Sequence, residues 1–196
     1  MLKVFSVMVL VLIFSVTGLV LANDHHEQAP QQTGFQAEFI GQVQFVQGRI
    51  TQLEQAFPED KFSWRPDEGV RSVSEVFMHT AFANYLFIRT SGQAVPDDIK
   101  ADVKPQEWES TATGKEEIKQ ILDRSFADLI SALKNLSEED LEKNVHVFGM
   151  DMSLRNFMLS MLSHMHEHLG QAIAYARSNG ITPPWTAERQ KAAEKQ

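Results

Sequence analysis

Three histidines have types and spacing that could bind a metal ion: His79, and then His164 and His168, which are four residues apart. Two imidazoles at positions i and i+4 lie above one another on one face of a helix, so both can reach the same ion. The third ligand then has to come from another segment, and His79 is the candidate. The pair does not form the HExxH motif of zinc proteases, so the spacing predicts a metal site without naming an enzyme class.

All three histidines interrupt apolar stripes that are typical of core-facing helices. The stripes advance in steps of three or four residues, and their members are Ser72, Val76, His79, Ala83 and Leu86 in one segment, and Leu154, Phe157, Met161, His164, His168, Gln171 and Tyr175 in the other. Burying three polar rings is costly unless each finds a partner, and one shared cation would serve all of them. A hydrogen-bonded core histidine without metal is the simpler alternative for His79 taken alone. His166 is predicted to face solvent.

The beginning of the chain has the pattern of a secretory signal peptide, which we assign to residues 1–22. One positive charge, Lys3, precedes an apolar run of 18 residues from Val4 to Leu21, and the small residue Ala22 follows. We therefore expect cleavage after Ala22 and export to a periplasmic or extracellular location. The alternative is an uncleaved signal that anchors the protein in the membrane, because a run of this length just reaches across a bilayer.

Composition excludes several classes of protein. The 196 residues carry a formal net charge of −8 and no clustered Lys/Arg stripe, so nucleic acid is a poor partner. The chain has no cysteine, which excludes disulfides, thiolate ligands and a cysteine nucleophile. Any metal must therefore be bound by nitrogen and oxygen atoms. The sequence does not identify the small-molecule substrate, and it leaves a homodimer open.

Periodicity predicts an all-α protein, a four-helix bundle with a long crossover loop. Ser72 and Glu75 form a capping box at the start of the second helix, and Thr113 and Glu116 are a candidate box for the third. The expected organisation is a flexible lead-in at 23–33, one bundle domain at 34–185 and a mobile tail at 186–196. Within the domain we predict helices at 35–57, 72–90, about 115–135 and 153–179, a crossover at 91–114 and a short strand-like hairpin or turn at 145–152.

Four strings of residues together resemble the DinB-like superfamily of bacterial four-helix metal proteins. They are Phe57-Pro58-Glu59-Asp60-Lys61-Phe62-Ser63-Trp64-Arg65-Pro66, then 72–79, then His164-x-x-x-His168-Leu169-Gly170-Gln171, and finally Gly180-Ile181-Thr182-Pro183-Pro184. The resemblance covers about 35–184. It implies an up-down-down-up bundle and a divalent metal, commonly zinc or nickel, bound at the positions of His79, His164 and His168. The family often has His-Arg-Gly-Gln where this chain has His168-Leu169-Gly170-Gln171, and often a further histidine where Glu167 stands.

Three imidazoles on a divalent ion leave coordination positions for water or substrate, which is typical of a catalytic site. The expected function is an exported metal-dependent hydrolase or transferase. The alternative is a non-catalytic metal-binding or envelope stress protein. Glu75, one turn before His79, and Gln171, three residues after His168, are candidates to orient the imidazoles through their second ring nitrogen. For Glu75, capping of the second helix is the competing interpretation.

Overall fold

The computed structural model describes residues 34–99 and 103–195. Four long helices make up the bundle: α1 (Phe35–Ala56), α2 (Val73–Thr90), α4 (Lys115–Lys134) and α6 (Leu154–Ser178). Each of them packs against two others, because α1 and α2 both contact α4 and α6. The predicted signal peptide and the predicted lead-in both lie outside the described residues. None of the helices in the described part of the chain combines the length and apolar composition needed to cross a bilayer.

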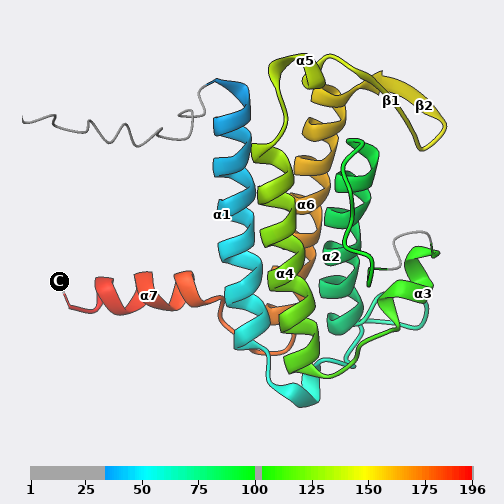
Figure 1. Cartoon of the computed structure of the whole chain (residues 1–196). Coiled ribbons are helices and arrows are strands. Elements are labelled where there is room, and N and C mark those ends of the chain that lie inside the picture. The colour runs from blue at the N-terminus through cyan, green and yellow to red at the C-terminus, as the bar shows by residue number, and fades with distance from the viewer. Residues whose placement is uncertain (1–33, 100–102, 196) are drawn as a thin grey trace, which may run out of the picture. The chain divides into compact units, whose positions relative to one another are not determined.

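The chain runs up-down-down-up through the four helices, as the family resemblance implies (Figure 1). The end of α1 lies beside the start of α4, where the Lys115 ammonium donates to the carbonyls of Gln55 and Phe57. The start of α1 lies beside the end of α4, since the Gln36 amide donates to Leu136. α2 and α4 are therefore parallel, and a long crossover returns the chain along the bundle between them.

Local signals account for most helix ends. The capping box at Ser72 is confirmed: its hydroxyl accepts from the Glu75 amide, while the Glu75 carboxylate accepts from the Ser72 amide. α6 ends before Gly180, whose φ of 74° is a left-handed conformation that glycine adopts without strain. The predicted box at Thr113 is wrong, because Gly114 is the N-cap of α4 and no side chain caps it. The chain enters α4 one residue later than that box requires.

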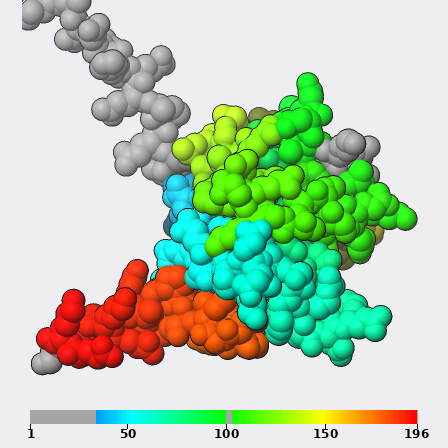
Figure 2. Space-filling view, turned by 90° about the horizontal axis from the view of Figure 1, so that it is seen from below, coloured from blue at the N-terminus to red at the C-terminus, as the bar shows by residue number. Residues whose placement is uncertain are grey.

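Three shorter elements connect the bundle helices or follow them: α5 (Glu138–Leu141), a hairpin of β1 (Asn144–Val147) and β2 (Met150–Ser153), and α7 (Pro184–Ala193). The hairpin is antiparallel, pairs Val147 with Met150, and matches the predicted turn region. α7 was not predicted, since we expected only a mobile tail from 186. It has no buried residue, and it extends away from the bundle beside the lower part of α1, to the left in Figure 1; Figure 2 shows it projecting from the bundle as well.

A short 3-10 turn, η1 (Glu59–Lys61), lies between α1 and α2. The crossover between α2 and α4 contains a further helix that was not predicted, α3 (Pro105–Glu109). α3 packs on α2 through Trp108, whose indole N–H donates to the carbonyl of Met78 at 3.1 Å. The Trp108 ring also contacts Phe82 and Tyr85. This contact fixes the crossover against the bundle and brings the next residue, Glu109, beside His79.

Candidate metal centre

The structure brings His79, His164 and His168 together, as the sequence predicted; we call them the histidine triad. The Nε2 atom of His164 lies 3.1 Å from Nε2 of His79 and 3.1 Å from Nε2 of His168. Nitrogen ligands of a tetrahedral zinc ion, bound at about 2.0–2.1 Å, are about 3.3–3.4 Å apart. The three ring nitrogens are therefore close enough for one divalent ion to contact all of them. His166, expected to face solvent, is exposed on α6.

Hydrogen bonds behind the rings determine which nitrogens carry protons. The Tyr175 hydroxyl donates to the carbonyl of Arg71 at 2.9 Å, so it accepts from the Gln171 amide nitrogen at 3.0 Å. The amide oxygen of Gln171 then faces Nδ1 of His168 at 2.9 Å, and Nδ1–H must be the donor. Neutral His168 consequently has its lone pair on Nε2, directed toward the triad. The prediction that Gln171 orients this imidazole agrees with these contacts.

His79 is held in the same way, but by a different residue from the one predicted. Its Nδ1 lies 2.6 Å from Oε1 of Glu109, the last residue of α3. Glu75 instead caps α2 and pairs with Arg65 at 3.1 Å, so the structure supports the capping interpretation, and the prediction that Glu75 orients an imidazole is wrong. The carboxylate of Glu75 binds the Ser72 amide and Arg65 at the N-terminus of α2, one turn away from His79, which it was expected to orient.

Electrostatics favour an ionised Glu109. Burial alone would raise the pKa of the Glu109 carboxyl, but hydrogen bonds from His79 and Arg71 outweigh it and hold the pKa below its usual range. Arg71 donates to both carboxylate oxygens, at 2.8 and 3.0 Å. Because an ionised carboxylate only accepts, His79 donates from Nδ1, and the neutral form of this imidazole has its lone pair on Nε2, on the side of the triad.

This arrangement is suited to a cation. His79 and His168 both present lone pairs to His164, whose Nε2 could offer a proton to only one of them. Burial, followed by the influence of His168 and His79, lowers the pKa of His164 to about 4, so the ring is neutral at pH 7. Burial also lowers the pKa of His168. Three imidazoles whose Nε2 atoms converge are a donor set that fits a divalent ion.

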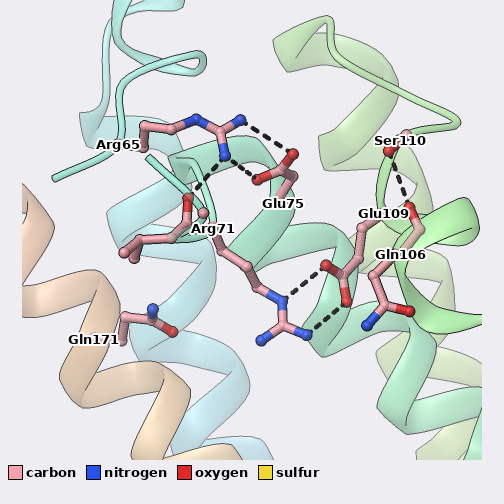
Figure 3. Close-up of a pocket in the computed structure, with 9 residues that line it drawn as sticks. Arg65, Arg71, Glu75, Gln106, Glu109, Ser110 and Gln171 are labelled. Carbon is pink, nitrogen blue, oxygen red and sulfur yellow. Dashed lines mark hydrogen bonds and ion pairs between the residues drawn. The ribbon is translucent and has the colours of Figure 1, made fainter. Parts of the chain in front are cut away.

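Two pockets flank the triad. A polar pocket of about 530 Å³ is lined by the Arg71–Glu109 ion pair together with Arg65, Glu75, Gln106 and Gln171 (Figure 3). A second cavity, which we call the apolar pocket, measures about 290 Å³ and is lined by His79, Phe82, Ala83, Leu86, Pro105, Phe148, Phe157, Ser160, Met161, His164 and Glu167. His79 and His164 line the apolar pocket, so a molecule bound there would lie beside two members of the triad.

The sequence analysis missed Glu109 and Arg71. Both lie outside the regular bundle helices, and neither belongs to an apolar stripe. The available signal was local: Pro105 at the first position of a short helix, followed by Trp108 and a carboxylate within the crossover. That signal predicts a helix, but it does not show which surface of the bundle the helix contacts.

Comparisons with known proteins agree with this fold. A solved DinB-like protein from Bacillus cereus ATCC 10987 has 17% identity and a TM-score of 0.65, over 76% of this chain and 95% of that one. YfiT from Bacillus subtilis, described as a probable metal-dependent hydrolase with an unusual four-helix bundle topology, has 13% identity and a TM-score of 0.61, over 79% and 95%.

A third similar structure is a mycothiol-dependent maleylpyruvate isomerase, with 15% identity and a TM-score of 0.54 over 68% of this chain and 59% of that one. No curated protein matches the sequence. These identities are low, so the solved structures support the fold and not a shared reaction.

The family model named DinB superfamily matches residues 42–172, which include the whole triad. Since this match spans most of the bundle, the chain belongs to the DinB superfamily.

Proposed function

We propose that this chain is an exported divalent-metal-dependent hydrolase that acts on a small molecule at the histidine triad. The observation that carries the proposal is the position of the apolar pocket. His79 and His164 face it, while the hydrogen bonds that fix the imidazoles lie on the other side. Three protein ligands leave part of an ion's coordination free, and here the free side adjoins a cavity that could hold a substrate.

Zinc and nickel are the metals we propose, because all the ligands are imidazoles and the chain contains no thiolate. Bound there, such an ion would supply Lewis acidity, which polarises a carbonyl or phosphoryl oxygen and makes a nearby water more acidic. The protein itself holds the three imidazoles in position. Glu109 and Gln171 fix two of them from behind, and Arg71 keeps Glu109 in place.

Glu167 is the residue that we assign to proton transfer. It is the one carboxylate among the described residues lining the apolar pocket, and it lies on α6 between His164 and His168 in sequence. A carboxylate beside the reacting group can accept a proton from water and return it to the leaving group. This role favours hydrolysis, which is also the reaction class in the description of YfiT.

A second candidate reaction is transfer to a low-molecular-weight thiol, because one similar structure is a mycothiol-dependent isomerase. The N-terminal pattern at residues 1–22 argues for export, and exported proteins work where reduced thiols are scarce. We therefore place hydrolysis first. The export proposal rests on this sequence pattern alone.

The test is a panel of small ester, amide and phosphoester substrates, assayed with protein that has been depleted of metal and then reloaded with zinc or nickel. We expect turnover that requires the ion, and we expect Glu167→Gln to lower kcat about 100-fold while metal content stays at the wild-type value. His166→Gln, an exposed neighbour, serves as the control. A fully loaded protein without turnover on any substrate would contradict the hydrolase and support the non-catalytic alternative.

A further inference from the structure

We propose that the substrate carries a compact apolar group, of the size of a phenyl ring or a branched alkyl chain, next to the bond that reacts, and that Phe148 covers this group. The proposal rests on the proposed function for the reacting end of the molecule. It goes further by assigning the chemical class of the remainder. It also gives a role to a residue outside the bundle helices, at the turn of the β1–β2 hairpin.

The walls of the apolar pocket separate into a polar end and an apolar end. His79, His164 and Glu167 stand at the polar end, whereas the rest of the wall is mainly aromatic and aliphatic, from Phe82, Leu86, Phe157 and Met161. A molecule that reacts at the triad must therefore place the atoms next to its reacting bond against apolar side chains. Charged or sugar-like groups there would lose water without gaining hydrogen bonds.

Size restricts the apolar group further. The apolar pocket measures about 290 Å³. An apolar cavity of roughly 150 Å³ stays dry and binds benzene. The pocket therefore accommodates one ring and a short connection to the reacting group. A longer chain would have to extend past the exposed part of the lining, to which Phe148 belongs.

Phe148 has a backbone conformation that its residue type does not favour. Its φ is 53°, in the left-handed region, and Gly149 follows with φ 74°, so the two form the tight turn between paired Val147 and Met150. Asn, Asp and Gly are the residues that favour this turn. The Phe148 side chain is 72% exposed, yet its ring contacts Phe157 of the pocket wall edge-on, with centroids 6.4 Å apart. Turn formation does not account for a phenylalanine here, whereas closing the pocket does.

The experiment compares two hydroxamates on the zinc-loaded protein by calorimetry. Both acetohydroxamate and phenylacetohydroxamate offer the same metal-binding group, and only the second carries a ring. We expect phenylacetohydroxamate to bind about ten- to a hundredfold more tightly, because burial of the ring adds to the same metal contact. Equal affinities would overturn the proposal.

Two variants locate the effect. Phe148→Asn suits the turn, so we expect unchanged or higher thermal stability together with about threefold weaker binding of the phenyl probe. Ser160→Phe fills the pocket from its exposed rim and should abolish the preference for the phenyl probe while acetohydroxamate binds as before. Phe45→Ala and Leu159→Phe alter exposed positions outside the pocket and serve as controls. A phenyl preference that survives Ser160→Phe would place the ring elsewhere and contradict the proposal.

A separate measurement distinguishes failure of the pocket from failure of the metal site. Toluene is titrated into chelator-treated protein carrying ¹³C-methyl methionine, and the spectra are followed by NMR. We expect the Met161 signal, from the pocket wall, to shift while that of Met78, in the core and outside the pocket, stays in place. This result would support the pocket even if the protein bound no zinc. No shift at Met161 would overturn the pocket proposal, whatever the metal content.

Discussion

The carboxylate of Glu109 accepts a hydrogen bond from Nδ1 of His79 at 2.6 Å, although thirty residues separate the two in the chain. The same carboxylate accepts two hydrogen bonds from Arg71, so it is held from both sides. α3 thus contributes to the candidate metal centre without providing a candidate ligand. It fixes the ring of His79, and with it the direction of the Nε2 lone pair.

Replacing Glu109 with Ala should weaken metal binding about 10- to 100-fold, the usual effect of losing a group that orients a ligand imidazole. Competition for zinc against a chromogenic chelator measures this change. Glu107→Ala is the matched control, because Glu107 lies on the same short helix and is exposed. Equal zinc affinities for Glu109→Ala and wild type would show that this carboxylate does not orient a ligand.

The triad should bind about one divalent ion per chain. His168→Ala removes one of three ligands and should reduce metal content after dialysis to a small fraction of the wild-type value. His166→Ala, which alters an exposed histidine on the same helix, should leave metal content unchanged. Elemental analysis of the dialysed proteins gives the answer, and wild-type loading in a His79→Ala/His168→Ala double variant would rule out this site.

Metal binding should also stabilise the fold, because the triad assembles residues of two helices that are far apart in the chain. Free ion at a thousand times its Kd would add about 4 kcal/mol to the free energy of unfolding, provided that the unfolded chain does not bind it. Calorimetry with zinc and then with excess chelator should show Tm rise and fall accordingly. The His164→Ala variant should show neither change, and a Tm insensitive to chelator in wild type would argue against the site.

Glu54 should make stability depend on pH. The side chain is fully buried in α1, and neither carboxylate oxygen has a hydrogen-bond partner among the described residues. Burial raises its pKa to about 7, against the opposing influence of Lys115 and Lys119. The pKa of Glu54 is higher in the folded state than in the unfolded state. The contribution of this carboxyl to the free energy of unfolding is therefore complete below about pH 4.5 and is lost as pH rises through 7.

Urea unfolding of chelator-treated protein at pH 5 and pH 8 tests this expectation. Relative to Glu54→Gln, the free energy of unfolding of wild type should fall by about 2.5 kcal/mol between these two pH values, since one unit of pKa corresponds to about 1.4 kcal/mol and pH 5 already lies above the unfolded pKa. Glu38→Gln, at an exposed position of the same helix, should follow wild type. Parallel pH profiles for wild type and Glu54→Gln would show that the carboxyl titrates normally.

Export should be visible at the N-terminus. If residues 1–22 are a cleaved signal, the mature protein begins at Asn23. Intact mass spectrometry of protein from the cell envelope or medium measures this directly. Recovery of the full-length chain in the membrane fraction would instead favour the uncleaved anchor, and full-length chain in the cytosol would contradict export.

The sequence by itself determined the four bundle helices and the residues that could bind metal. Apolar steps of three and four specify which face of a helix is buried, and this property is local enough to read from the chain. The spacing of His164 and His168 places both on one face of α6 for the same reason, and the capping box at Ser72 depends only on residues within one turn. The family resemblance supplied the direction of the helices.

Only the tertiary structure decided what surrounds the triad. Glu109 reaches His79 because Trp108 docks α3 on α2, a contact between segments thirty residues apart that no periodicity encodes. Phe148 likewise lies against Phe157 because the hairpin is anchored at the start of α6. Such contacts depend on where irregular segments pack, and packing is a property of the assembled bundle. The candidate ligands could therefore be predicted from the sequence, whereas the pocket beside them and the contact that orients His79 could be identified only in the tertiary structure.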